Sequence, residues 1–321
     1  MDQYKVTGKI GEGAHGLVLK GQNLNTGQEV ALKKVLLKKL EDGIPNTVIR
    51  EIKALQEIDS EYVVHLLDVF PQGLGFVLVF EYMPSGLWEI LRDADNPLSA
   101  SQMKTYMIML LKGVSYLHEH SIMHRDLKPA NLLVSKEGVL KIADLGLGRM
   151  FSKDHSRPYS HQVATRWYRA PELLYGATYY TEAVDLWAVG CIIGELLTNS
   201  PLFPGETDIE QLAIVIRTLG SPTHETWPGV RELPDYNKIS FPETKGVNWD
   251  QIFSDCTPEA IDLLSKFLIY NADKRLRARQ TAVSELISII SSLCQLSDMP
   301  KPSDGHRQQF KAKDLQSFYF C

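Results

Sequence analysis

A change in the spacing of apolar residues divides this chain near residues 83–86. Before that point, apolar residues alternate with polar ones or form short runs between Gly and Asn-Thr-Gly turns, which predicts strands. One segment within this part, Pro45 to Ile58, has apolar residues three and four apart and predicts a helix. After "MPSG" the helical spacing dominates. A block of strands followed by a block of helices indicates an α+β chain with two lobes.

The same change sets the domain boundaries that we expect. Residues 1–83 form a small lobe, residues 84–296 form a larger and mostly helical lobe, and residues 297–321 form a polar, loosely ordered tail. A length of 321 residues gives each lobe enough chain for its own core. The helices expected in the larger lobe are one that starts at a Ser cap in "SASQ", and then Thr181 to Thr198, Asp208 to Leu219, Pro258 to Leu268, and Ala282 to Leu296.

Composition narrows the classes of function. A net charge of -5 argues against nucleic-acid binding by bulk electrostatics. The four cysteines are widely spread, which indicates neither a zinc cluster nor a disulfide framework and favours a reducing compartment. The first residues lack the pattern of a signal peptide. The longest apolar stretch, Val184 to Leu197, is too short for a bilayer and contains two acids, so we expect a buried helix and no membrane insertion.

Three glycines in "GEGAHGLV" have the spacing of a phosphate-binding loop. Gly11, Gly13 and Gly16 are followed by a predicted strand, which places them at a hairpin tip and disfavours a dinucleotide fold, where a helix would follow. Glycine lets backbone amides approach phosphate oxygens because no Cβ is in the way. Taken alone, the motif fits a plain glycine-rich turn equally well.

A lysine and a glutamate follow this loop in a suggestive order. Lys33 lies on the next predicted strand, and Glu51 lies eighteen residues later in the predicted helix. Each could be an ordinary surface residue. The order of glycine loop, strand lysine and helix glutamate favours a cation that reaches phosphates while a carboxylate holds it.

The segment "HRDLKPAN" and the later "DLG" supply the remaining chemistry. Asp126 can orient a substrate hydroxyl and accept its proton. Lys128 can stabilise charge on a transferring phosphoryl group. Asn131 and Asp144 carry the oxygen ligands that Mg²⁺ prefers. All these elements, in this order, predict a phosphoryl-transfer site of the protein-kinase type that uses ATP and Mg²⁺.

At this point the chain resembles a eukaryotic protein kinase from Tyr4 to Arg277. The resemblance implies the two-lobed kinase fold, with a small antiparallel β-sheet lobe that contains one key helix and a larger, mostly α-helical lobe. It assigns nucleotide binding to Ile10, Gly11, Glu12, Gly13, Ala14, His15, Gly16, Val18, Ala31, Lys33, Val64, Phe80, Glu81, Met83 and Leu133. Of these, Glu81 and Met83 would bond the edge of adenine through their backbone.

The resemblance also assigns roles around the catalytic loop. It makes Lys33 and Glu51 an activating ion pair, Asp126 the catalytic base, and Asn131 and Asp144 the metal ligands. The supporting residues that it implies are Thr165, which braces Asp126 and Lys128; Asp185, which holds the loop backbone; and Glu172, which pairs with Arg275.

Two further segments, "ATRWYRAPELLYG" and "SPLFPGETDIEQL", resemble the group that holds cyclin-dependent and mitogen-activated kinases. In that group the arginine matching Arg169 donates a hydrogen bond to a backbone carbonyl at the pocket for the residue after the phosphoacceptor. A substrate amide there would lack a partner, and proline has no amide N–H, so the resemblance implies Ser/Thr-Pro substrates. "PNTVIRE", Pro45 to Glu51, resembles the helix that binds cyclins and implies a cyclin-like activator.

Ser160 stands where relatives carry a phosphorylatable threonine in the activation loop. Arg50, Arg125 and Arg149 match the three arginines that gather that phosphate, so we expect an upstream kinase and an ordered loop after phosphorylation. The alternative is an ordinary loop serine.

Several segments, among them "GKIGEGAHG" and "SHQVATRWYRAPELLYGA", are most similar to the cell-cycle-related kinases, a divergent branch of the cyclin-dependent kinase family. That resemblance implies cell-cycle or ciliary signalling and a place in cytoplasm, nucleus and cilium. Departures at Gly86, Leu145 and Gly148, and beyond Arg277, keep open a scaffold that binds a cyclin-like partner without efficient turnover.

Overall fold

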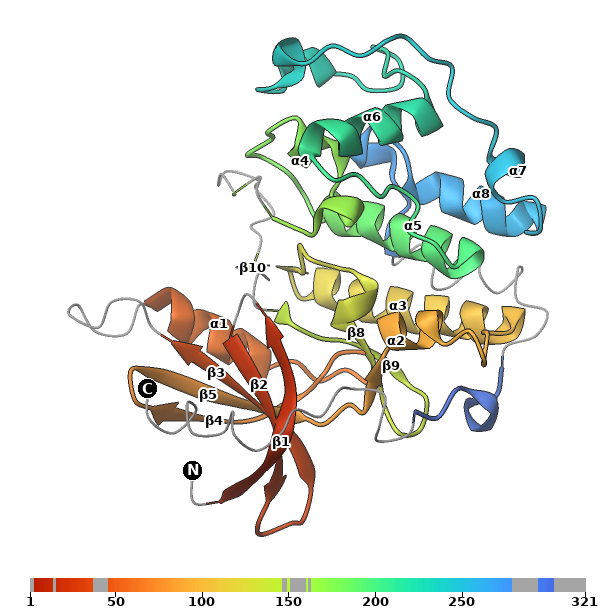
Figure 1. The fold of residues 1–321 in the computed structure, drawn as a ribbon. Coiled ribbons are helices and arrows are strands. Elements are labelled where there is room, and N and C mark those ends of the chain that lie inside the picture. The colour runs from red at the N-terminus through yellow and green to blue at the C-terminus, as the bar shows by residue number, and fades with distance from the viewer. Residues whose placement is uncertain are drawn as a thin grey trace.

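The computed structural model describes residues 3–13, 16–36, 46–145, 149–150, 160, 163–278 and 294–302. A β-sheet lobe lies at one end of the molecule and a helical lobe at the other (Figure 1). The predicted α+β, two-lobed fold is therefore confirmed. The described helices include none long and apolar enough to cross a membrane.

The small lobe is a five-stranded antiparallel sheet in the order β1-β2-β3-β5-β4. Its strands are β1 (Tyr4–Gly13), β2 (Gly16–Asn23), β3 (Glu29–Leu36), β4 (Leu66–Gln72) and β5 (Gly75–Glu81), and its helix is α1 (Asn46–Gln56). The alternation read from the sequence produces a buried face with Leu19, Leu32 and Val79 at its centre. The register sets Lys33 between Val18 and Leu78, on the strand that the sequence predicted.

The chain crosses between the lobes at residues 81–83, which we call the hinge. It then forms β6 (Ser85–Gly86) and α2 (Leu87–Arg92), a short helix that the sequence reading did not identify. β6 joins β8 (Leu132–Val134) and β9 (Leu140–Ile142) in a second antiparallel sheet. β7 (Ile122–Met123) pairs with β10 (Arg149–Met150). These short strands position the residues around the catalytic loop.

The large lobe is built around two long helices. α3 (Ala100–Glu119) starts at Ser99, whose side chain and that of Gln102 form the reciprocal hydrogen bonds of a capping box. α5 (Ala183–Thr198) is apolar on nearly all sides and is buried, as the sequence predicted. The other described helices are α4 (Pro171–Leu174), α6 (Asp208–Leu219), α7 (Trp249–Ile252) and α8 (Pro258–Phe267). Short 3₁₀ helices span Pro129–Asn131, Arg166–Tyr168, Val230–Glu232, Tyr236–Lys238, Ala272–Lys274 and Leu296–Asp298.

The last described segment, residues 294–302, lies against the large lobe. Met299 is buried, and Gln102 of α3 donates a hydrogen bond to the Asp298 carbonyl at 2.8 Å. Met299 packs on Gly138, where a Cβ would come within 2.6 Å of the methionine Cβ and where φ is +88°. The tail predicted from residue 297 thus begins with a packed stretch, and residues 303–321 lie outside the described part. Most of the helix predicted from Ala282 to Leu296 also lies outside it.

Candidate active site

Asp185 of α5 holds the backbone of the catalytic loop, which contains "HRDLKPAN". Both oxygens of Asp185 accept backbone hydrogen bonds, from His124 N at 2.9 Å and from Arg125 N at 2.7 Å. His118 of α3 donates a third hydrogen bond to Asp185 at 2.9 Å. Burial acts to raise the pKa of Asp185, but the hydrogen bond and charge of His118 outweigh it and hold the pKa below its ordinary value. The loop backbone is therefore fixed by an ionised carboxylate.

The Asp126 side chain accepts four hydrogen bonds. Its Oδ1 accepts hydrogen bonds from the backbone N and the hydroxyl of Thr165, at 2.8 and 2.9 Å. Its Oδ2 accepts from Lys128 at 2.9 Å and from Asn131 Nδ2 at 3.2 Å. Lys128 also donates to the Thr165 hydroxyl at 2.7 Å. The structure thus brings together four residues that the sequence reading placed in one site, although Thr165 is 39 positions from Asp126.

Asp144 lies opposite this cluster and connects it to the small lobe. Lys33 Nζ is 2.6 Å from Asp144 Oδ1, and Asp144 has the left-handed φ of +60°. The residue before it, Ala143, donates to the backbone oxygen of Asn131 at 2.8 Å and accepts from the His124 ring at 2.9 Å. The segment with Asp144 is therefore tied directly to the catalytic loop.

The donor set suits a hard divalent cation shared with phosphate groups. Among the described residues, no three His, Cys, Asp or Glu side chains gather as a metal cluster. The predicted ligands are one carboxylate, Asp144, and the amide oxygen of Asn131, whose amide nitrogen is bonded to the Asp126 backbone at 2.8 Å. Such a pair leaves most coordination positions to phosphate oxygens and water, as Mg²⁺ commonly requires.

Apolar side chains from both lobes surround the predicted adenine position. Val64, Met83 and Leu133 form a buried cluster, and Phe80 and Ala143 pack against it. The Glu81 carboxylate is directed elsewhere, because Lys141 donates to both of its oxygens at 2.8 and 2.9 Å. Burial acts to raise the pKa of Glu81, but the Lys141 hydrogen bond and other donors outweigh it and lower the pKa. The Glu81 backbone N–H also donates to the His65 carbonyl at 3.2 Å, and the backbone contact of Glu81 with adenine stays a prediction.

Comparison of the sequence with models of known protein families identifies the family of this chain. The protein kinase domain model matches residues 4–287. The chain belongs to the protein kinase family. The kinase is 61% identical to "Cyclin-dependent kinase 20" of Danio rerio over 95% of this chain and 89% of that protein. It is 58% identical to the mouse protein and 56% identical to the human protein of the same name, each over 94% of this chain and 88% of the relative.

These relatives make the kinase a cyclin-dependent-type Ser/Thr protein kinase that binds ATP, as the sequence reading predicted. Cell-cycle-related kinase is another name for cyclin-dependent kinase 20, so the resemblance within the family is also confirmed. Leu145, one of the departures that favoured a scaffold, packs against the large-lobe core and fills an apolar position there.

The kinase's Arg169 occupies the place where the sequence reading expected it. Its Nε donates to the Val163 carbonyl and its Nη2 to the Ala164 carbonyl, both at 2.9 Å. Ala164 has the left-handed φ of +65°, which is uncommon for a residue other than glycine. Nearby, Arg275 makes two hydrogen bonds of 2.6 and 2.7 Å to the Glu172 carboxylate, and both residues are buried. This second pair fixes the end of the activation segment to the large lobe.

Some predicted residues lie outside the described part. Ala14 and His15 of the glycine loop do, although the flanking Gly13 and Gly16 pair with each other across the hairpin. The side chains of Glu12, Arg50, Glu51 and Arg149 also lie outside it, and so do the Lys33–Glu51 pair and two members of the arginine cluster.

The third arginine of that cluster is described. Arg125 is buried and donates to the Tyr180 hydroxyl at 3.4 Å, and this hydroxyl donates to the Ser160 carbonyl at 2.7 Å. Ser160 itself is exposed. Tyr180 therefore brings the predicted switch residue close to one of its predicted arginines.

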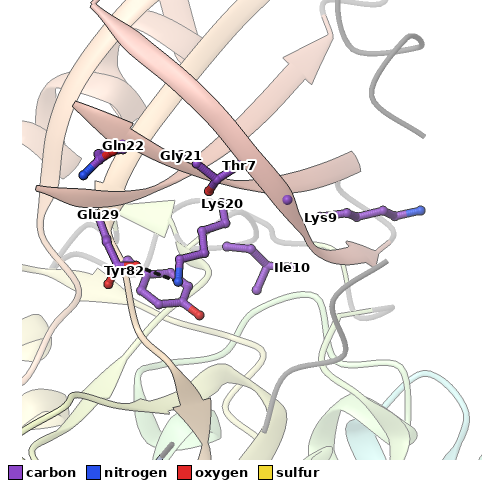
Figure 2. Close-up of a pocket in the computed structure, with 9 residues that line it drawn as sticks. Thr7, Lys9, Ile10, Lys20, Gly21, Gln22, Glu29 and Tyr82 are labelled. Atoms are coloured by element: carbon purple, nitrogen blue, oxygen red, sulfur yellow. Dashed lines mark ion pairs between the residues drawn. The ribbon is translucent and has the colours of Figure 1, made fainter. Parts of the chain in front are cut away.

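A shallow polar hollow of about 230 Å³ lies beside the hinge, between β1, β2 and Tyr82 (Figure 2). Within it, Lys20 Nζ lies 2.6 Å from Glu29 Oε1 and 4.1 Å from the centre of the Tyr82 ring. Lys136, from the turn between β8 and β9, donates to the other Glu29 oxygen at 2.5 Å. The hydrogen bond from Lys136 is the largest cause of the lowered pKa of Glu29. Glu29 thus connects the two lobes beside the hinge.

The sequence reading missed these interlobe residues and also His118 and Asp208. No sequence motif marks any of these residues. Each is a charged or titratable residue that lies in or beside a recognised segment. "SPLFPGETDIEQL" contained Asp208 but gave no reason to select it.

Proposed function

We propose that this kinase transfers the γ-phosphoryl of ATP to Ser or Thr residues that precede proline. The observation that carries the proposal is the pair of hydrogen bonds from Arg169 to the Val163 and Ala164 carbonyls. With those acceptors occupied, an amide N–H on the residue after the phosphoacceptor would lose its partner on binding, at a cost of about 1–3 kcal/mol. Proline carries no N–H and avoids that cost.

We assign a separate role in the reaction to each charged residue around the catalytic loop. Asp126, held by Thr165, Lys128 and Asn131, would orient the substrate hydroxyl and take its proton. Lys128, which already bridges Asp126 and Thr165, would stabilise charge on the transferring group. Lys33 would reach the phosphates from β3 and would exchange its contact with Asp144 for them.

We propose Mg²⁺ as the divalent metal, held by Asp144 and the amide oxygen of Asn131. When bound, it would neutralise the negative charge of the phosphates and keep them in line for transfer. The support is the hard oxygen character of the two protein ligands, which suits Mg²⁺ better than a soft metal.

The test of specificity uses matched peptides that differ only in Pro or Ala after the acceptor Ser. The expected preference in kcat/KM for Pro is about 5- to 150-fold, which corresponds to the unsatisfied-amide cost given above. Arg169→Gln should bring the two peptides close to equal rates. Asp126→Asn serves as the control for transfer by a contaminant. Equal rates for both peptides in the unchanged kinase would refute the proposal.

We further propose that phosphorylation of Ser160 by an upstream kinase orders the activation segment. The support is the contact chain from Arg125 through Tyr180 to the Ser160 backbone, which links an exposed serine to a buried cation. A phosphate there could accept charge-assisted hydrogen bonds. Preparations verified by mass spectrometry as phosphorylated or not at Ser160 should differ in kcat, and Ser160→Ala should stay at the lower value. Equal activity in all three would contradict the switch.

A cyclin-like activator bound at Pro45–Glu51 is the corresponding proposal for the partner. It is supported by the helical geometry of α1 and by the similarity to cyclin-dependent kinase 20 of zebrafish and human. Adding candidate cyclins to the kinase and to a variant with Ile49→Glu, an exposed residue of that helix, would test it. Activation that is equal in both proteins would exclude this site.

We also propose a role in cell-cycle or ciliary signalling, in the cytoplasm, nucleus and cilium, from the family of the relatives alone. Imaging the tagged kinase in dividing and ciliated cells tests this. Exclusion from all three compartments would refute it.

A further inference from the structure

The guanidinium of Arg169 has a third partner that the proposed function does not use. While Nε and Nη2 hold the Val163 and Ala164 carbonyls, Nη1 donates to Asp208 Oδ1 at 3.0 Å. Arg166 Nε donates to the same Asp208 oxygen at 2.8 Å. Asp208 is therefore the one described carboxylate that contacts the arginine at the pocket for the residue after the phosphoacceptor.

The start of α6 holds Asp208 in place. Asp208 is the first residue of that helix, and the capping residue Thr207 accepts a hydrogen bond from Glu210 N at 3.1 Å. One turn later, the fully buried Gln211 contacts the segment that carries both arginines, because its Nε2 lies 3.4 Å from the Trp167 carbonyl.

A second contact ties the same two regions together. Trp167 Nε1 donates to the Gly205 carbonyl at 3.0 Å, and Gly205 N donates to Gln211 Oε1 at 3.0 Å. The helix start and the segment 166–169 are thus joined by several neutral hydrogen bonds. Loss of the Asp208 charge would leave this joint in place and remove only the contacts of Asp208 with Arg166 and Arg169.

The charges and burial explain what the carboxylate does. The Arg169 side chain is only 13% exposed, and burial lowers the pKa of its guanidinium, which Asp208 opposes. Without a carboxylate, a largely desolvated cation would gain by moving toward water, and the Val163 and Ala164 carbonyls would then be open to a substrate amide. The Asp208 side chain is 49% exposed, so its pairing adds little to folding stability and can be removed without unfolding the kinase.

We propose that Asp208 is a positioning residue that sets the preference for proline by fixing the Arg169 guanidinium on the Val163 and Ala164 carbonyls. This inference rests on the proposed Ser/Thr-Pro specificity and names a residue that determines it from another element. Asp208 contacts no reacting atom. Its effect on the reaction passes through Arg169.

The experiment measures kcat/KM of the full-length kinase for the matched Ser-Pro and Ser-Ala peptides. Asp208→Asn keeps the size of the side chain and removes its charge. It should lower the Pro-to-Ala ratio about tenfold, a part of the roughly 5- to 150-fold expected for the unsatisfied amide, mainly through a lower KM for the Ser-Ala peptide. Asp208→Glu should restore most of the ratio.

Arg166→Gln is the matched control. It removes the other partner of Asp208 and leaves the Arg169–Asp208 contact, so the ratio should stay within about twofold of the unchanged kinase, as expected for an exposed pair. The double variant Arg169→Gln, Asp208→Asn should equal Arg169→Gln alone, because Asp208 acts only through Arg169.

The outcomes separate this inference from the proposed function. If Arg169→Gln removes the preference but Asp208→Asn keeps it, the proposed function stands and the inference is overturned. If Arg169→Gln also keeps it, both are overturned. A second readout needs no substrate: the Nε–H exchange rate of Arg169, followed by NMR, should rise in Asp208→Asn and stay unchanged in Arg166→Gln. An unchanged rate in Asp208→Asn overturns the inference, and an intact thermal transition in each variant excludes unfolding as the cause of any change.

Discussion

Two ion pairs of this kinase join residues that are similarly far apart in sequence and differ in burial and in the number of hydrogen bonds between the partners. Arg275 and Glu172 are 103 positions apart and lie inside the large lobe, where the arginine side chain is fully buried. Lys136 and Glu29 are 107 positions apart and connect the lobes at the surface, where the lysine side chain is 54% exposed. The closest N–O distances, 2.6 and 2.5 Å, are nearly equal. Distance alone therefore says little about what each pair contributes.

The contribution of each ion pair depends on what can solvate one partner after the other is removed. Water can solvate Lys136 or Glu29 when the other is removed, so the exposed pair is worth about 0–1 kcal/mol. The Arg275 side chain is fully buried, so removal of Glu172 would leave its charge without an anion and with backbone carbonyls as its remaining partners. We therefore expect the buried pair to hold the end of the activation segment firmly and the exposed pair to oppose separation of the lobes only weakly.

The largest effect on stability should come from Glu172→Gln. It leaves the fully buried Arg275 guanidinium without its carboxylate and should lower the free energy of unfolding by about 3–5 kcal/mol. Urea denaturation measures this change. Asp262→Asn, which breaks the exposed Lys266–Asp262 pair of α8, is the control and should stay within about 0.5 kcal/mol. Equal effects of the two substitutions would show that burial does not determine how much an ion pair contributes to stability.

Asp126→Asn extends the comparison to a buried carboxylate whose work is catalytic. The amide cannot take a proton and no longer attracts Lys128, so kcat for a Ser-Pro peptide should fall about 10²- to 10⁴-fold. Nucleotide affinity should change far less, because Asp126 contacts Thr165, Lys128 and Asn131 and none of the apolar cluster at the adenine position. Phosphate-transfer kinetics and ATP titration separate the two. A variant that loses ATP binding to the same degree as turnover would contradict a purely catalytic role.

Lys136→Gln should have a small effect on stability, within about 1 kcal/mol, because both partners face water. Its consequence should instead be kinetic. With one interlobe contact fewer, the nucleotide should dissociate faster, by up to about fivefold for a contact of that size. Stopped-flow release of a fluorescent nucleotide measures the rate. Lys238→Gln, in an exposed pair far from the hinge, should leave it unchanged.

The smallest effect is a pH dependence of the same contact. The pKa of Glu29 is lowered in the folded kinase, mainly by Lys136, so its contribution is fully present above the unfolded value near 4.3 and is lost as the pH falls through the lowered folded value. The difference in unfolding free energy between the unchanged kinase and Lys136→Gln should therefore shrink below about pH 4. Urea curves at pH 7, 5, 4 and 3 test this. A difference that grows in acid would show that another group is responsible.

Local sequence predicted a large share of this architecture. The five strands of the small lobe followed from apolar alternation, and α6 begins at Asp208 and ends at Leu219 as predicted from its period. The buried helix α5 followed from an apolar run too short for a membrane. The order of Lys33, Asp126, Asn131 and Asp144 along the chain predicted that they share one site, and the structure places them around Ala143 and the catalytic loop. These features depend on neighbours within a turn or a strand, or on a motif.

Neither periodicity nor motifs predicted the residues that make long-range contacts around the site. Asp208 acts on Arg169 from 39 positions away, and Lys136 reaches Glu29 from 107 positions away. The packing of Met299 on Gly138 is likewise a contact between distant segments, in a part of the chain that its polarity had marked as a loose tail.

The sequence by itself determined the kind of elements, their order and the chemical groups available for phosphoryl transfer, because periodicity and residue chemistry are local properties. Only the tertiary structure decided which of two carboxylates with similar N–O distances is buried and which is free to open, and which acid orients Arg169. Burial and pairing depend on how the whole chain excludes water, and no stretch of sequence carries that information alone.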